Sequence, residues 1–383
     1  MGVWITLFSL SVFAPFYTYG LYPILLRLLP KEKFQKDSSY EPAVSILIAA
    51  YNEEKVIKEK VENLLQLEYP QEKLEIWIAS DGSTDQTVIL AQEAGKDWIQ
   101  ILDLPRGGKV AALNAMLSRA KGEVIIFSDA NTMFEKHAVQ KLVRNFKDQR
   151  IGCVSGQMRY KVDHTSGEGA KSESAYWKYE NWVKKQESKL GRLSGANGAI
   201  YAIRKKYLPE IPSGIINDDF YVSTYLLQQG YDVILDEEAV AYEEPNDKLG
   251  EQFKRHVRDG AGHYQAMRIF WRMLLPRKGS FVYVSHRVIK WMVPFFMISA
   301  FISNLILGLR EAGWFFLWIC QAAGYVIMLL YGVMTKKKRK IKGMVGKLVS
   351  ITFYFVSVNA ALLCGFFRFV GNKQKGTWET SRS

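Results

Sequence analysis

The chain has 383 residues, which is too many for one ordinary core and suits one large soluble domain joined to a further part. Its formal net charge is +13, but a concentrated basic run lies at residues 336–340 between two apolar stretches, so we expect no nucleic-acid partner. Only three cysteines are present, and the absence of a CxxC pair predicts neither a disulfide framework nor a zinc site.

Long uncharged stretches at both ends of the chain predict a protein of the cell membrane. A helix of about 19 residues spans about 28 Å, close to the thickness of the hydrocarbon core. The first stretch resembles a secretory signal in position, but it lacks a basic start and a small-residue cleavage site, so we expect a retained anchor. We predict about four transmembrane helices, at residues 3–26, 291–309, 312–335 and 348–367.

The basic residues also predict an orientation. The run at residues 336–340 is cytoplasmic by the positive-inside rule, which places residues 31–285 in the cytoplasm and residues 310–311 outside. The same count sends the C-terminal tail outside, whereas its own basic residues favour the inside. The basic residues of the tail are Arg368, Lys373, Lys375 and Arg382. A re-entrant or wrongly assigned span would explain the conflict, and the side of the membrane on which the tail lies stays open.

The soluble region begins after a charged linker, and strand-like and helix-like patterns alternate along it. Short apolar runs rich in Val and Ile are typical of buried strands, and apolar residues at helical spacing follow each run. Such alternation predicts βαβ units and a mostly parallel α/β sheet with flanking helices. We expect strands at residues 44–50, 74–79, 98–102 and 123–128, and helices at residues 53–67, 84–95 and 109–120.

The pattern is less regular after residue 151. We expect a strand at residues 152–160, a helix at 172–189 and another helix at 220–229. The helix at 172–189 carries aromatic side chains that could stack on sugar rings, although helical spacing favours packing in a core or at the membrane interface. These side chains are Tyr176, Trp177, Tyr179 and Trp182.

Two acidic segments follow neighbouring strands at residues 81–85 and 128–131. The carboxyl ends of parallel strands form the ligand edge of an open α/β sheet. Asp81 can accept hydrogen bonds from a base or ribose, although a turn with helix capping explains the segment equally well. Asp129 and Asn131 offer oxygen ligands to a divalent cation, with one negative charge fewer than two acids would give.

Three further segments carry candidate chemistry. The glycine-rich loop before Lys109 suits a phosphate but does not match the Walker pattern, and a solvated lysine is the alternative. Asp218 and Asp219 should raise each other's pKa and supply a general base, unless they only cap the helix that follows. The basic stretch at 252–275 predicts a helix at the membrane surface, from which Arg255 or Arg258 can reach a diphosphate.

The order of these segments resembles the membrane-integrated family 2 glycosyltransferases, which include the cellulose, hyaluronan and poly-N-acetylglucosamine synthases. The resemblance covers residues 42–275 and the flanking spans, and it implies a Rossmann-like GT-A-type domain that uses Mg²⁺ or Mn²⁺. By this resemblance Asp219 is the catalytic base, and Asp129 and Asn131 are the metal ligands, with Asn131 in place of the usual second acid. The implied nucleotide-binding residues are Ala50, Tyr51, Asn52, Glu53, Asp81, Lys109, Asn114 and Asp129.

The resemblance also implies an acceptor site. Residues 194–198 resemble the small-residue segment that lines it, and Gln252 and Arg255 match a conserved family motif in which His256 replaces a tryptophan that normally contacts the acceptor sugar. This replacement puts processive synthesis in doubt. The implied acceptor residues are Gly195, Asn197, Asp218, Gln252, Arg255 and His256.

The sequence thus predicts an inverting transferase that moves a sugar from a UDP-sugar to a growing glycan, such as an extracellular or capsular polysaccharide. A non-processive enzyme that adds one sugar to a lipid-linked acceptor is the alternative, and an inactive nucleotide- or glycan-binding regulator is a third hypothesis. The donor sugar, a homo-oligomer and accessory export subunits are left open. The expected organisation is an anchor at 1–30, a cytoplasmic transferase domain at 40–250, interfacial helices at 251–280, three spans at 285–370 and a tail at 371–383.

Overall fold

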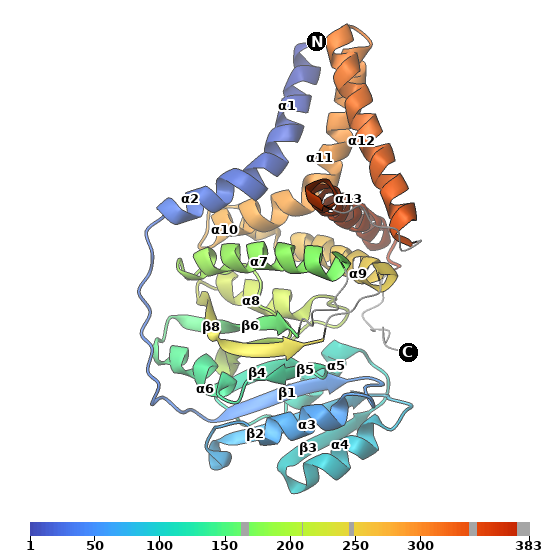
Figure 1. Ribbon diagram of the computed structural model, residues 1–383. Helices are drawn as coiled ribbons and strands as arrows, with labels where there is room; N and C mark the ends of the chain where they lie inside the picture. The colour runs from blue at the N-terminus through green and yellow to red at the C-terminus, as the bar shows by residue number, and fades with distance from the viewer. Residues whose placement is uncertain (162–167, 209, 245–248, 337–342, 374–383) are drawn as a thin grey trace.

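The computed structural model describes residues 1–161, 168–208, 210–244, 249–336 and 343–373. Three regions are stacked in Figure 1: a sheet domain, a middle layer of helices that lie across it, and a group of steep helices that rise from this layer. The linker after the first helices runs down one side of the domain to the sheet.

The core of the domain is one mixed sheet of eight strands in the order β3-β2-β1-β4-β7-β6-β8-β5. Strands β3, β2, β1 and β4 pair in parallel, β6 pairs in parallel with β8, and the remaining three pairings are antiparallel. The α/β class is confirmed. The strands are β1 (Val44–Ala50), β2 (Leu74–Asp81), β3 (Ile99–Leu104), β4 (Val124–Asp129), β5 (Thr132–Phe134), β6 (Ile151–Tyr160), β7 (Ile200–Arg204) and β8 (Asp232–Glu243).

Helices cover both faces of this sheet, which explains why every residue of β1 is buried and apolar or small. One face packs against α3, α4 and α6, and the other packs against α5 and α8 and continues into aromatic residues of the membrane-side elements. The sequence did not predict β5, β7, β8 or α6. The helices are α3 (Ile57–Leu65), α4 (Thr87–Gly95), α5 (Lys109–Leu117), α6 (Ala138–Val143), α7 (Glu168–Ser188), α8 (Asp218–Gln228) and α9 (Leu249–Ile269).

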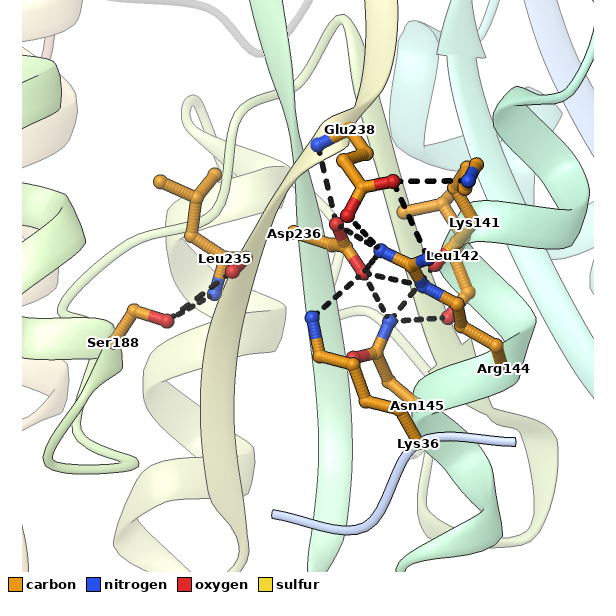
Figure 2. Close-up of polar contacts among 9 residues, drawn as sticks. All are labelled: Lys36, Lys141, Leu142, Arg144, Asn145, Ser188, Leu235, Asp236 and Glu238. Atoms are coloured by element: carbon orange, nitrogen blue, oxygen red, sulfur yellow. Dashed lines mark hydrogen bonds and ion pairs between the residues drawn. The ribbon is translucent and has the colours of Figure 1, made fainter. Parts of the chain in front are cut away.

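A cluster of buried charges attaches the linker to the domain (Figure 2). Asp236 on β8 is 2% exposed and accepts hydrogen bonds from Arg144 Nε (3.0 Å) and Asn145 Nδ2 (2.8 Å). Lys36 of the linker adds a third donor at 3.2 Å. A buried carboxylate is stable only when it is paired in this way, so the linker is held at a defined place beside the sheet.

Within the part of the chain that the structure describes, four helices are long and apolar enough to cross a membrane, as the sequence predicted. The first and second pack against each other through polar contacts as well as apolar ones: Ser11 Oγ donates to Ser299 Oγ (2.9 Å) and Thr18 Oγ1 donates to the carbonyl of Ser285 (2.7 Å). These helices are Gly2–Leu28, which comprises α1 (Gly2–Phe16), a π-helical turn and α2 (Tyr22–Leu28); Ser280–Gly308, which ends in α11 (Ile289–Gly308); Ala312–Thr335 within α12 (Ala312–Lys336); and α13 (Gly343–Val370).

The aromatic residues of α7 that the structure describes have a packing role. Tyr179 and Trp182 pack with Tyr22 and Leu26 of α2 in one apolar cluster, and the Tyr179 hydroxyl donates to the carbonyl of Tyr19 at 2.8 Å. This agrees with the packing role that their helical spacing predicted. The side chains of Tyr176 and Trp177 lie outside the described part of the structure.

Helix α13 approaches α9 closely at Gly365. A Cβ atom at this position would lie 2.8 Å from the amide nitrogen of Ala261 and from the carbonyl oxygen of Val257. Only glycine fits here without movement of one of the two helix backbones.

We therefore expect Gly365→Ala to destabilise the protein. Overpacking typically costs roughly 1–3 kcal/mol, which lowers the midpoint of thermal unfolding of the purified protein in detergent. Gly324→Ala on α12 is the matched control, because a Cβ there has no neighbour within 4 Å. Equal unfolding midpoints for the two variants would contradict the close helix crossing.

Candidate active site

The ammonium group of Lys109 contacts carboxylates from two different segments at the carboxyl edge of the sheet. Lys109 is the first residue of α5, and its Nζ lies 3.0 Å from Asp129 Oδ1 at the end of β4 and 3.3 Å from Asp218 Oδ1 at the start of α8. Burial lowers the pKa of Lys109, but the charges of Asp129, Asp218 and Asp219 outweigh it and raise the pKa. A permanent cation therefore sits where the sequence predicted the diphosphate.

Asp81 holds the glycine-rich loop in place. Its buried carboxylate accepts hydrogen bonds from the backbone N–H groups of Gly107 (2.7 Å) and Gly108 (2.8 Å) through Oδ1, and from Arg106 (2.6 Å) through Oδ2. The Arg106 guanidinium also lies 3.3 Å from the centre of the Tyr51 ring. The loop that leads into α5 is thus fixed by Asp81, and contact of Asp81 with a nucleoside stays a prediction.

The loops after β1 and β2 bind each other. The N–H groups of Asn52 and Glu53 donate to Ser83 Oγ (3.1 Å) and Thr87 Oγ1 (2.8 Å), and Thr84 N–H donates to Asn52 Oδ1 (2.8 Å). Asn52 has a φ of 51°, a conformation that Asn tolerates better than most residues. The residues that make these bonds were predicted to form the first turn of each helix. Helix α3 therefore begins at residue 57 and not at 53, and α4 begins at residue 87 and not at 84.

Asp218 and Asp219 are the first two residues of α8, after Asn217 at the N-cap position, whose side chain makes no cap bond. Asp219 Oδ1 accepts the backbone N–H of Phe220 at 2.8 Å, so this carboxylate contributes to the first turn of the helix. Asp218 is buried, and its Oδ2 has no hydrogen-bond partner among the described residues. Burial and then the charge of Asp218 raise the pKa of Asp219 to about 6, although Lys109 acts against them. Asp219 is therefore suited to accept a proton near neutral pH.

The two residues expected to hold a metal have different surroundings. The Asp129 side chain is 40% exposed, whereas Asn131 Nδ2 donates to Glu243 Oε1 at 2.9 Å, which leaves the Asn131 amide oxygen as its ligand atom. Within the described residues no group of three or more His, Cys, Asp or Glu could hold a metal ion. Two side-chain oxygens fit a hard divalent cation that takes its other ligands from a diphosphate and water.

The segment predicted to line the acceptor site lies against Asp219. A Cβ atom at Gly198 would be 3.1 Å from Asp219 Oδ2. The N–H of Ala196 donates to Ser223 Oγ (3.0 Å), and the Ser223 hydroxyl donates to the Asp219 carbonyl (2.7 Å). Asn197 Oδ1 accepts the N–H of the next residue but one at 3.2 Å, which stabilises the turn.

Helix α9 contacts the turn that carries the two aspartates. Asn217 Nδ2 donates to the carbonyl of Asp259 on α9 at 3.1 Å. Gln252 on α9 is buried, and His256 lies edge-on to Tyr354 of α13 with ring centres 6.3 Å apart. The three predicted acceptor residues of this segment, Gln252, Arg255 and His256, all lie on α9.

Asn114 supports a pocket beside the Asp81 loop. Its side chain donates to the carbonyl of Ile211 (2.8 Å) and accepts the N–H of the same residue (3.2 Å). The pocket has a volume of about 420 Å³ and includes Gly107, which Asp81 holds. Further lining residues are Val110, Ala111, Pro212 and Ser213.

Sequence reasoning missed a buried charge cluster between α7 and the second apolar helix. Glu180 on α7 accepts from Arg287 Nη1 (2.8 Å) and Lys290 Nζ (2.6 Å), and Glu187 contacts His286. None of these five residues is more than 9% exposed. Two features of the sequence could have indicated this cluster. Glu180 and Glu187 lie on one face of a helix, and basic residues interrupt the start of an apolar helix.

Arg287 extends this cluster to the segment at Asp219. Its Nε donates to the carbonyl of Ser194 at 2.8 Å, and its Nη2 donates to the same oxygen. Gly195 follows with a φ of +97°, and a Cβ there would lie 2.8 Å from the Phe220 ring. Because Arg287 belongs to an apolar helix, the position of residues 194–198 depends on that helix.

A family model described as "Glycosyl transferase family 2" matches residues 45–211, which contain β1, β2 and β4 with Asp81, Lys109 and Asp129. The chain carries a family 2 glycosyltransferase domain. Asp219 and α9 lie beyond the matched residues. The resemblance seen in the sequence is thereby confirmed at the level of the family.

Curated relatives match parts of the chain. The chain is 33% identical over 173 residues to a beta-monoglucosyldiacylglycerol synthase of Nostoc sp. (44% of this chain, 36% of the relative). It is 26% identical over 271 residues to a poly-beta-1,6-N-acetyl-D-glucosamine synthase of Staphylococcus epidermidis (69% and 65%). The chain thus covers between about one third and two thirds of the length of these relatives.

A solved structure matches nearly the whole chain. It is the mannosyltransferase PcManGT from Pyrobaculum calidifontis in complex with GDP-Man and Mn²⁺, with a TM-score of 0.71, 19% identity and coverage of 97% of this chain and 99% of that one. At this identity the match establishes the fold. The GT-A-type domain and its apolar helices therefore form an architecture that another protein shares.

The pKa of Asp219 predicts the acid side of the pH profile of sugar transfer. A base must be unprotonated, so kcat/KM should fall about tenfold per pH unit below about 6. Asp218→Asn removes a charge that raises this pKa, and the acid limb should move to lower pH. Asp103→Asn, at an exposed site on β3, should leave the profile unchanged. An unshifted limb in Asp218→Asn would contradict the coupling.

Arg287 should affect the acceptor more than the donor. Arg287→Lys keeps the charge but loses the forked contact with the Ser194 carbonyl, so the KM for the acceptor should rise roughly tenfold while the KM for the donor stays unchanged. Lys290→Arg is the matched control, because Lys290 binds Glu180 in the same cluster, whereas Arg287 also binds the Ser194 carbonyl. Equal effects of both variants on both KM values would mean that Arg287 has only a structural role.

Proposed function

We propose that the protein is an inverting membrane glycosyltransferase that moves a sugar from a UDP-sugar to a glycan acceptor, with its catalytic domain in the cytoplasm. The observation that carries the proposal is the contact of Lys109 with both Asp129 and Asp218. In this proposal Lys109 is the phosphate-binding cation and Asp129 is a metal ligand, and Asp218 adjoins the proposed base Asp219, all at the ligand edge of the sheet. The family 2 domain supports the same reaction class.

Asp219 acts as the base in this proposal. The proton of the acceptor hydroxyl passes to Asp219, the acceptor oxygen bonds to C1 of the donor sugar, and the bond between C1 and the diphosphate oxygen breaks. UDP leaves with the electron pair of that bond, and attack from the opposite side inverts the configuration at C1. Lys109 stabilises the charge that develops on the leaving diphosphate.

Asp129 and the amide oxygen of Asn131 would hold Mg²⁺ or Mn²⁺ against the diphosphate. The ion supplies additional positive charge for the leaving group when it is bound. The hydrogen bond from Asn131 Nδ2 to Glu243 orients the amide so that its oxygen is available, in the way that outer hydrogen bonds orient metal ligands. The structural neighbour, which was solved with Mn²⁺, supports a divalent ion here.

The nucleoside would bind beside Asp81 and Tyr51. In this proposal the nucleobase stacks on the Tyr51 ring and displaces the Arg106 guanidinium, which lies over the ring at 3.3 Å. The freed Asp81 Oδ2 can then accept a hydrogen bond from the base or ribose. Ala50, Asn52 and Glu53 complete this part of the site through the linked loops of β1 and β2.

A lipid acceptor is the second candidate. It is favoured by the match to a glucosyldiacylglycerol synthase and by an apolar crevice of about 230 Å³ between α11, α12 and α13. A single addition to a lipid leaves a small product, whereas glycan extension leaves a polymer, so the size of the product decides. The crevice is lined by residues that include Met297, Phe301, Tyr325, Asn359 and Leu363.

The test is the release of nucleoside diphosphate from a panel of sugar nucleotides that includes UDP-glucose, UDP-N-acetylglucosamine and GDP-mannose. We expect release from a UDP-sugar, and Asp219→Asn should lower kcat by about 10²–10⁴-fold with little change in the Kd for UDP, since base and nucleotide contacts are different residues. Asp103→Asn serves as the control. Unchanged turnover in Asp219→Asn would sink the assignment of the base.

A further inference from the structure

Helix α13 follows α9 along most of its length. The contacts advance together on the two helices, so they run side by side in the same direction. Near the middle of α9, Gly365 of α13 touches the α9 backbone at Val257 and Ala261. The ring contacts join Tyr354 to His256 (6.3 Å), Phe366 to Tyr264 (5.2 Å) and Phe369 to Arg268 (5.6 Å).

The other side of α9 belongs to the glycosyltransferase domain. Gly262 approaches Asn217 so closely that a Cβ would lie 2.6 Å from its amide, and Phe270 just after α9 packs on Tyr221 of α8. Figure 1 shows α7, α9 and α13 low in the helical region, whereas α1, α11 and α12 rise above them. Helix α13 thus lies across the foot of the steep helices.

The sequence of α13 has two different faces. Polar or small residues recur every three or four positions on the face that contains Tyr354 and Gly365 and therefore points to α9. This stripe consists of Lys347, Ser350, Tyr354, Ser357, Ala361, Gly365 and Arg368. The large apolar side chains exposed on other faces are Met344, Val345, Leu348, Ile351, Phe367 and Val370.

We infer that α13 does not cross the membrane but lies along the membrane face next to the glycosyltransferase domain. Its apolar side enters the boundary between lipid headgroups and acyl chains, and the side that contains Tyr354 and Gly365 packs on α9. The chain then crosses the membrane three times, through the first three apolar helices. Residue 373 and the domain lie on the same side.

This placement removes the conflict in the charge pattern. With α13 along the surface, the basic run at residues 336–340 and the basic residues Arg368 and Lys373 share one side of the membrane. A fourth crossing would place Lys373 opposite that run and would separate α13 from α9. The inference concerns topology and does not depend on the proposed reaction.

The test is the labelling of single cysteines with a membrane-impermeant maleimide in intact cells. In a full-length background with Cys153→Ala, Cys320→Ala and Cys364→Ala, one cysteine is introduced in place of an exposed residue. The three positions are Lys373 after α13, Glu311 between α11 and α12, and Glu72 in the domain. Labelling after detergent solubilisation shows that each cysteine is reactive.

We expect Glu311→Cys to be labelled in intact cells, and Glu72→Cys and Lys373→Cys to be labelled only after the membrane is opened. The inference requires Lys373→Cys to behave like Glu72→Cys. If Lys373→Cys is labelled in intact cells to the same extent as Glu311→Cys, α13 crosses the membrane and the inference is wrong. Sugar transfer in the cysteine-free background shows independently that the domain is folded.

Discussion

The carboxylates of Asp129, Asp218 and Asp219 meet at one edge of the sheet, and the ammonium of Lys109 is the cation that lets them do so. Without it, three negative charges would repel one another in a region that is partly shielded from water. Lys109 reaches them because Asp81 fixes the loop that leads into α5. The two acidic segments of the sequence, at residues 81–85 and 128–131, therefore have connected roles. Asp81 of the first segment positions Lys109, and Lys109 binds Asp129 of the second.

This arrangement also depends on the membrane-side helices. Arg287 at the start of the second apolar helix binds the Ser194 carbonyl, and α9 binds the turn at Asn217. The pairing of Arg287 and Lys290 with Glu180 satisfies charges that would be costly to bury alone. The part of the site where we expect the acceptor is therefore built partly by helices outside the sheet, whereas the part where we expect the nucleotide is built by the sheet and its loops.

The sequence predicted the parallel half of the sheet because its strands are short apolar runs followed by helical patterns. It did not predict β7 or β8, since β7 has only five residues and pairs with strands that are distant in the chain, and β8 contains charged residues such as Asp236 that are buried by pairing. Local patterns carry no information about such distant partners.

The candidate site was predicted to a similar extent. Motif spacing identified Lys109, Asp129 and Asp218, which contact one another in the structure. It could not reveal that Asp81 binds the glycine-rich loop, or that Glu243 on β8 orients Asn131, because both contacts join segments far apart in the sequence. Roles in catalysis and binding stay predictions for all of these residues.

A structure of the full chain with UDP and Mn²⁺ tests the central claim most directly. We expect the diphosphate to contact Lys109 Nζ, the metal to contact Asp129, and Asp219 to face the open side of the site without binding the nucleotide. Two results would contradict the claim. The nucleotide could bind away from the carboxyl ends of β1, β2 and β4, or it could leave the contact of Lys109 with Asp129 unchanged and Asp129 without metal.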